Sequence, residues 1–153
     1  MAGYYRPPNW LVRYVLNPQV AFTTWLGVGP GTARVLAVKG RKSGKWRTVP
    51  LNMLTHDGHR YLVSPRGETQ WVRNLRAAGD GELRRGRRAE SFHARELSDD
   101  EKVAVLRAYL KKWAIEMGIF FEGTGARSSD EAILAIAPKH PTFEVVPVSS
   151  ADG

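Results

Sequence analysis

The chain has 153 residues, of which 42% are hydrophobic and 25% charged, and it contains no cysteine. This composition predicts one globular domain and excludes a disulfide framework, a thiol nucleophile and a thiolate metal site. No stretch approaches the roughly 20 apolar residues of a membrane span, and no signal peptide is visible, so we expect a cytoplasmic protein. The net charge of +8 predicts an anionic partner: nucleic acid, a membrane surface or a phosphorylated small molecule.

Residues 1–32 are predicted to form an N-terminal helical arm that packs on the domain formed by residues 33–153. Short helices are expected over Trp10–Leu16 and Gln19–Leu26, and the Gly/Pro-rich residues 27–31 form a turn. Residues 1–18 combine tyrosine and tryptophan with arginine, which is also typical of a segment that contacts a membrane surface. We favour packing on the domain and keep peripheral membrane contact as an alternative.

The remaining chain alternates strand and helix signals. Strands are expected over Ala33–Val38, Thr48–Thr55, Arg60–Ser64, Ala89–Leu97 and Thr142–Val148, with a tight turn at Asp57-Gly58 and a charged turn at Glu82–Arg88. Helices are expected over Gly67–Ala78, from a capping box at Ser98–Glu101 to Gly118, and over Ala132–Ala137 after a second capping box at Ser128–Glu131. About five strands in meander order with helices at the ends predict an α+β fold, a small antiparallel barrel with flanking helices.

The positive charge gathers in one loop. Residues 1–56 hold eight basic residues and no acidic one, and five of the eight lie between Lys39 and Arg47. The loop from Gly40 to Arg47 has glycines that permit a sharp turn and present backbone amides, together with cationic side chains that suit a phosphate. A solvated hairpin tip is the alternative interpretation.

Four sequence motifs resemble the deazaflavin-dependent nitroreductase family. They read GRKSG at residues 40–44, RTVPL at 47–51, YLVSPRG at 61–67 and QWVRNLRA at 70–77, in the order and spacing of that family. The resemblance covers roughly residues 33–100, and more loosely the strand from His140. It implies a split β-barrel that binds coenzyme F420, a deazaflavin with a phosphate and an oligoglutamate tail.

The resemblance also implies which residues bind this cofactor. It assigns binding of the phosphate and acidic tail to Arg41, Lys42, Ser43 and Arg47. It assigns binding of the deazaflavin ring to backbone contacts of Thr48, Val49 and Pro50. The turn of Ser64, Arg66 and Gly67 matches a Ser-Lys-Gly turn in relatives, although Pro65 departs from that pattern. Gln70, Trp71 and Asn74 fall on a helix beside the cofactor, where Trp71 fits an apolar core equally well.

The implied reaction is hydride transfer from the reduced deazaflavin to a quinone, activated alkene, nitro compound or unsaturated lipid, which needs no nucleophile and no metal. Residues 113–121 contain no tyrosine, so no catalytic proton donor is assigned and solvent fits that role. An apolar substrate pocket is expected from Trp113, Met117, Phe120 and Phe121.

Two alternatives stay open. A flavin mononucleotide (FMN) oxidoreductase of the same barrel type would need the same basic residues. A non-enzymatic barrel that binds nucleic acid would need several aromatic side chains on one exposed face, yet Tyr61, Phe92 and Phe143 lie in apolar strands. Our leading interpretation involves a small hydrophobic substrate and no nucleic acid, and it leaves monomer and homodimer open. His56 and His59 are interpreted as solvated rather than as metal ligands, and Arg84–Arg88 as a surface turn rather than a polyanion site.

Overall fold

The structure, a computed structural model, describes residues 32–148. The two helices expected within residues 1–32 therefore lie outside the described residues. No helix in the described part of the chain is long and apolar enough to cross a membrane.

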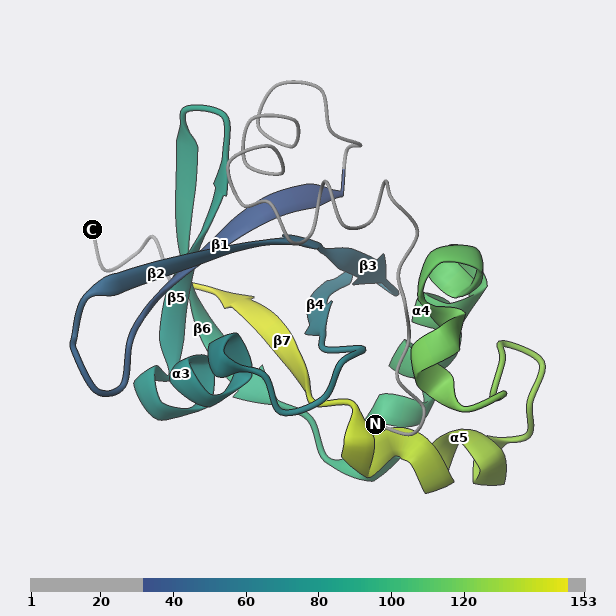
Figure 1. Cartoon of the computed structure of the whole chain (residues 1–153). Helices are drawn as coiled ribbons and strands as arrows, with labels where there is room; N and C mark the ends of the chain where they lie inside the picture. Colours follow the sequence, from purple (N-terminus) through teal and green to yellow (C-terminus); the bar gives the residue numbers. More distant parts are fainter. Residues whose placement is uncertain (1–31, 149–153) are drawn as a thin grey trace.

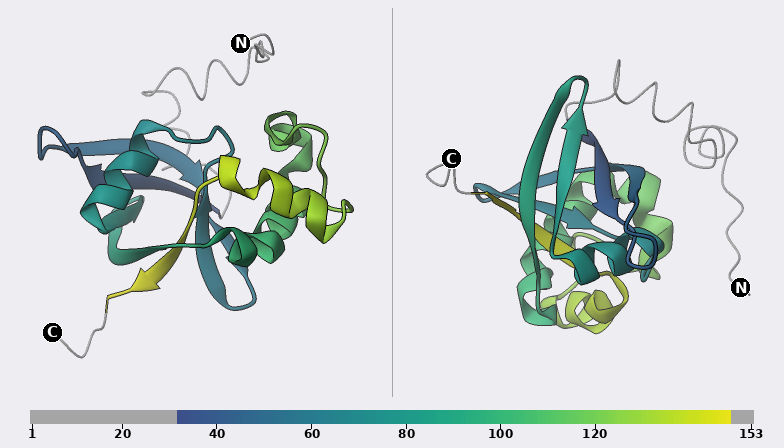
Figure 2. Two further views of the ribbon diagram at one scale, coloured as in Figure 1. Left: turned by 90° about the horizontal axis from the view of Figure 1, so that it is seen from below. Right: turned by 90° about the vertical axis from the view of Figure 1, so that its left-hand side faces the viewer.

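A single antiparallel sheet of seven strands forms the body of the protein (Figure 1). The strands are β1 (Ala33–Lys39), β2 (Trp46–Asn52), β3 (Leu54–His56), β4 (His59–Val63), β5 (Asp80–Arg85), β6 (Arg88–Glu96) and β7 (Thr142–Pro147). Their order across the sheet is β2-β1-β5-β6-β7-β4-β3. The sheet curls on itself, and helices α3, α4 and α5 lie against it (Figures 1 and 2). The predicted barrel with flanking helices is confirmed.

The two edge strands of the sheet are consecutive in the chain. The sequence predicts one strand over Thr48–Thr55, whereas the chain bends at Met53 and divides into β2, which pairs with β1, and β3, which pairs with β4. The Met53 side chain is buried, and its N–H donates to the carbonyl of Thr32 at 2.9 Å. One bent segment thus supplies both edges of the curled sheet.

The meander order was wrong, because β1 borders β5 and β4 borders β7. The charged turn expected at Glu82–Arg88 was also wrong, since most of it belongs to β5. Gly81 and Leu83 are buried while Glu82 and Arg84 are partly exposed, which is the alternation of a half-buried strand. The high charge of the outward positions concealed this period in the sequence.

Helix α3 (Gln70–Ala78) begins three residues after its predicted start. Gly67 has a positive φ of 89° and belongs to the preceding turn, so the helix cannot include it. The helix ends at Gly79, which adopts the left-handed conformation and donates its N–H to the carbonyl of Leu75.

Helix α4 (Asp99–Met117) starts at the predicted capping box, in which Ser98 and Glu101 bond reciprocally. A kink at Trp113, with φ of −124°, precedes the helix end. A 3₁₀ turn, η1 (Gly118–Phe121), follows.

Helix α5 (Asp130–Ile136) leads into the 3₁₀ turn η2 (Ala137–Lys139). The second predicted capping box is not formed, because Ser129 rather than Ser128 caps α5 and accepts a hydrogen bond from the N–H of Ala132. The Ser128 hydroxyl oxygen instead accepts from the N–H of Gly125.

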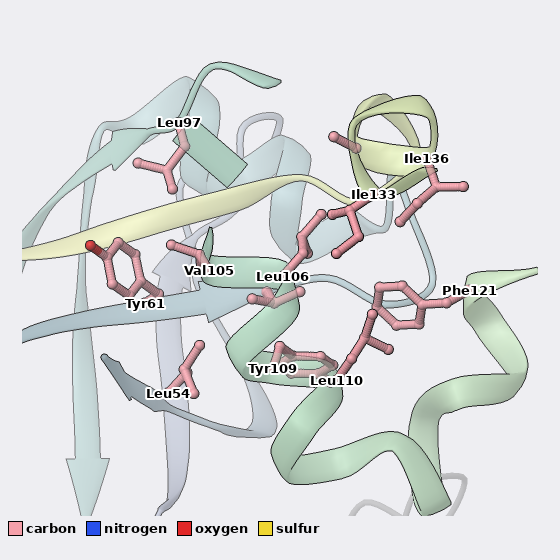
Figure 3. Close-up of a cluster of buried hydrophobic side chains, with 12 residues drawn as sticks. Leu54, Tyr61, Leu97, Val105, Leu106, Tyr109, Leu110, Phe121, Ile133 and Ile136 are labelled. Atoms are coloured by element: carbon pink, nitrogen blue, oxygen red, sulfur yellow. The ribbon is translucent and has the colours of Figure 1, made fainter. Parts of the chain in front are cut away.

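Two apolar clusters lie on either side of β4. Tyr61 and Val63 face the first cluster and Leu62 faces the second, so β4 is buried on both faces. The first cluster joins the sheet to α4 and α5 (Figure 3) and consists of Leu54, Tyr61, Val63, Leu97, Val105, Leu106, Tyr109, Leu110, Phe121, Ile133, Ile136 and Ala137. The second fills the space between the sheet and α3 and consists of Leu36, Val38, Met53, Leu62, Val72, Leu75, Leu83, Phe92, Phe143 and Val145.

Candidate functional site

The glycine loop, residues 40–45, connects β1 to β2 with a fixed shape. The N–H of Gly40 donates to the carbonyl of Lys45 at 2.8 Å, and the N–H of Gly44 donates to the carbonyl of Gly40 at 2.8 Å. Gly44 has a φ of 73°, a conformation that glycine adopts without strain. A Cβ at Gly40 would stand 3.0 Å from the Ser43 hydroxyl oxygen, so a larger residue there would have to displace that side chain.

Helix α3 holds the first cation of this loop in place. The Asn74 side-chain oxygen accepts from the backbone N–H of Arg41 at 3.1 Å and from its guanidinium at 2.8 Å, and Gln70 accepts from the same guanidinium at 2.9 Å. Gln70 and Asn74 are four residues apart and therefore share one face of the helix. Asn74 is only 6% exposed. The sequence placed both amides beside the binding site, but it did not reveal that they anchor Arg41.

The glycine loop carries exposed cationic side chains, while several of its backbone amides are already used within the protein. The backbone amides of Gly40, Arg41, Gly44 and Lys45 already donate within the protein, so the expected presentation of amides to a phosphate does not hold for these four. The side chains of Arg41, Lys42, Ser43 and Arg47 are all exposed. Guanidinium and ammonium groups at such positions bind phosphate and carboxylate directly.

A tight turn precedes α3 and displays Arg66. Ser64 is buried, and its hydroxyl donates to the carbonyl of Gly67 at 2.6 Å. The hydroxyl of Ser64 therefore shapes the turn. Gly67 has a positive φ, and a Cβ there would stand 3.4 Å from the carbonyl oxygen of Lys139. Arg66 remains exposed, with its guanidinium 6.0 Å from the centre of the Phe120 ring.

The expected pocket residues lie at the end of α4 and in η1, and they differ in exposure. Trp113, Met117 and Phe120 are partly buried against the first apolar cluster, and the Trp113 ring lies 5.0 Å from that of Tyr109. Phe121 is completely buried, so its ring supports this segment from within the core. The contact between Arg66 and Phe120 joins the segment to the turn before α3.

The remaining expected site residues lie on β2 and α3. Thr48 is exposed and Val49 and Pro50 are half-buried on β2, which is an edge strand with backbone groups that point away from its partner β1. Trp71 is half-buried, packs against the second cluster and lies 6.1 Å from the Phe143 ring. The core interpretation of Trp71 thus has direct support.

A buried histidine that the sequence analysis did not single out lies behind this region. His140 is 2% exposed and stacks on Phe121, with ring centres 4.0 Å apart and 17° between the planes. Burial lowers its pKa below the ordinary value of 6.5, and the backbone carbonyls of Ser64 and Pro65, close to the ring but outside good hydrogen-bond geometry, partly offset this effect. The signal for this burial in the sequence was the position of the histidine directly before Pro141 and a buried strand.

This burial predicts a pH dependence of folding. The folded protein binds a proton at His140 less tightly than the unfolded chain does. The free energy of unfolding is therefore highest above pH 6.5 and declines as the pH falls below it. Urea unfolding at pH 8.0 and pH 5.5 should show this loss, and His140→Phe should remove it while keeping a stacked ring. His93→Gln, at an exposed strand position, is the control and should retain the loss. An unchanged pH dependence in His140→Phe would contradict this assignment.

Metal binding and base stacking receive no support from the described residues. No group of three or more metal-ligating side chains gathers within residues 32–148, and His59 pairs with Glu144 at 2.9 Å. Tyr61, Phe92 and Phe143 are all buried, so these rings do not form the exposed stacking surface that the nucleic-acid alternative needs.

Comparison with known proteins agrees with this arrangement. A family model described as F420H(2)-dependent quinone reductase matches residues 22–118, more than half of the chain. The matched region includes the glycine loop, the turn with Arg66, and helices α3 and α4. No curated protein is similar enough to count as a relative.

Several solved structures share the fold. An F420-H2 dependent reductase, FDR-A, is 22% identical with a TM-score of 0.53, and the match covers 75% of this chain and 94% of that one. A protein described as a domain-swapped dimer is 19% identical with a TM-score of 0.53, covering 85% and 96%. A putative pyridoxamine 5′-phosphate oxidase from Listeria innocua is 12% identical with a TM-score of 0.51, covering 77% and 85%.

Proposed function

Because the chain belongs to the F420H(2)-dependent quinone reductase family, we propose that it transfers a hydride from reduced coenzyme F420 to a hydrophobic, electron-poor acceptor. Family membership makes the protein an oxidoreductase with coenzyme F420 as its cofactor. A quinone is the acceptor class that the family description names, and activated alkenes, nitro compounds and unsaturated lipids are the further classes with suitable chemistry.

The observation that carries this proposal is the set of cations around α3. Arg41 is held by Gln70 and Asn74, Lys42 and Arg47 are exposed beside it, and Arg66 precedes the same helix. A phosphate followed by several carboxylates is a polyanion that needs such a series of cationic side chains. The residues present therefore fit the cofactor.

Strand β2 supplies the second part of the cofactor site. We assign Thr48, Val49 and Pro50 to the deazaflavin ring, because an edge strand offers backbone N–H and C=O groups that the sheet does not use. Pro50 has no N–H, so it contributes only its carbonyl and the flat face of its ring. Ser43 and the turn of Ser64 and Gly67 complete the site by fixing the backbone around it.

When bound, the reduced deazaflavin supplies a hydride, and the protein's contribution is to position the acceptor and exclude water. We assign Trp113, Met117 and Phe120 to an apolar surface that binds the acceptor, with Phe121 supporting it from the core. Solvent supplies the proton, as no side chain in this segment is assigned that role. Arg66, 6.0 Å from the Phe120 ring centre, adjoins this surface.

Oxidation of reduced coenzyme F420 by a panel of acceptors tests the proposal. We expect turnover with quinones, and the rates with enones, nitroaromatics and unsaturated lipids define the acceptor class. Phe120→Ala should raise KM for the preferred acceptor more than it lowers kcat, since it removes binding surface rather than a reacting group. Absence of turnover with every acceptor would contradict the proposed function.

We assign Asn74 the role of a positioning residue for Arg41. Asn74→Ala should leave Arg41 without two of its hydrogen bonds and weaken cofactor binding by about 1 kcal/mol, roughly fivefold. Asn74→Asp should rescue binding in part, because a carboxylate still accepts both bonds. Fluorescence titration with coenzyme F420 measures the affinity. Equal affinities of Asn74→Ala and the native protein for coenzyme F420 would contradict this role of Asn74.

A further inference from the structure

The turn that displays Arg66 rests on the segment that enters β7. The backbone N–H of Ser64, at the start of the turn, donates to the carbonyl of Pro141 at 2.9 Å. At the end of the turn, a Cβ on Gly67 would stand 3.4 Å from the carbonyl oxygen of Lys139. The residue between Lys139 and Pro141 in the chain therefore lies against the turn.

That residue is His140, which presents a buried imidazole to the turn. It is 2% exposed, and neither ring nitrogen has a hydrogen-bond partner within residues 32–148. The backbone carbonyls of Ser64 and Pro65 are the polar groups of the turn that act on the ring. A neutral imidazole carries one N–H donor and one acceptor nitrogen. Burying this donor beside two carbonyls without a completed hydrogen bond is costly for folding alone.

The same ring joins the turn to the segment assigned to acceptor binding. One face of it stacks on Phe121, with ring centres 4.0 Å apart. Phe121 follows Phe120, whose ring centre lies 6.0 Å from the guanidinium of Arg66. The residue before the imidazole, Lys139, pairs with Glu122 at 2.6 Å. These contacts on η1 and η2 hold the ring close to the carbonyls of the turn.

We propose that His140 is a positioning residue for Arg66. When Arg66 binds the anionic part of the cofactor, the ring N–H completes a hydrogen bond to a carbonyl of the turn, that of Ser64 or Pro65. Hydrogen bonds at binding sites are often long or poorly aligned in the free protein and tighten in the complex. The completed bond satisfies the buried donor and fixes the backbone directly before Arg66. This role rests on the proposed function.

NMR of the imidazole nitrogens in the native full-length chain tests this proposal without a mutation. At pH 8.0 the His140 ring is neutral, because burial lowers its pKa below the ordinary value of 6.5. Saturation with coenzyme F420 should shift its N–H signal in the direction of a stronger hydrogen bond. His93, exposed on β6, is the internal control and should not shift.

An unchanged His140 signal at saturation would overturn the proposal and leave the cofactor assignment intact. Absence of coenzyme F420 binding to the native protein would instead contradict the proposed function, and this role with it. The two failures are therefore distinguishable in one titration.

A double-mutant cycle tests whether His140 acts through Arg66. His140→Phe keeps a stacked ring without the N–H, and we expect it to weaken coenzyme F420 binding roughly fivefold. In Arg66→Gln protein the same change should cause no further loss, because the turn no longer holds the anion. His140→Gln, which keeps a side-chain N–H, should retain more affinity than His140→Phe, and His93→Gln is the control. Thermal unfolding checks that each variant folds.

Losses that multiply in the double variant would show a merely structural role of His140 and would overturn the proposal. Native affinity in His140→Phe would overturn it as well. If His140→Phe fails to fold, the NMR titration of the native chain decides alone.

Discussion

Replacing Phe121 with alanine is expected to lower the free energy of unfolding by about 3–5 kcal/mol, the usual cost of removing a fully buried aromatic ring. The ring is completely buried among residues of α4, α5 and the sheet. It also stacks on His140 and lies 5.9 Å from the Tyr109 ring. The substitution would therefore open a cavity where three elements meet. Urea or thermal unfolding measures the loss.

Phe120 provides the matched control for that substitution. It is the neighbouring residue with the same side chain, but it is only partly buried. We expect Phe120→Ala to cost less than half as much stability and to affect acceptor binding instead. If both variants lost the same stability, the division between a core ring and a surface ring would be wrong.

Replacing Lys42 and Arg47 together with alanine is expected to weaken coenzyme F420 binding by at least about 2 kcal/mol, or roughly 30-fold. Both side chains are exposed on the glycine loop and the following strand, so their removal should leave the fold intact. Each would lose a charge-assisted bond to a phosphate or carboxylate of the cofactor. Fluorescence quenching of the cofactor measures the affinity.

The charge-matched control for this pair is Lys111→Ala with Arg127→Ala. It removes the same two positive charges from exposed positions on α4 and the loop before α5. A similar loss in both double variants would mean that the overall charge, rather than the glycine loop, attracts the cofactor. Unchanged binding in the Lys42 and Arg47 variant would show that the loop does not hold the anionic tail.

Much of this arrangement follows from local sequence signals. The glycine-framed loop, the turn at Asp57-Gly58 and the capping box at Ser98 each depend on a few adjacent residues. These three features can therefore be predicted from the sequence, and each is present in the structure at the predicted position. The positive charge of the loop likewise follows from composition alone.

Some corrections are local, such as the capping residue of α5 and the start of α3, but the larger ones concern interactions between distant segments. The pairing of β1 with β5, and the bend at Met53 that sends one segment to both edges of the sheet, depend on the curl of the whole sheet. The same is true of Phe121, whose burial depends on packing against α5 and His140 rather than on its place beside Phe120. Asn74 binds Arg41 across 33 residues, a contact that no local pattern contains.

Parallel titration of the native protein with coenzyme F420 and with FMN tests the central claim most directly. We predict saturable one-site binding of coenzyme F420, at least tenfold tighter than that of FMN, because the cations around α3 are more numerous than a single phosphate needs and suit an oligoglutamate tail. Tighter binding of FMN than of coenzyme F420, or no saturable binding of coenzyme F420, would contradict it.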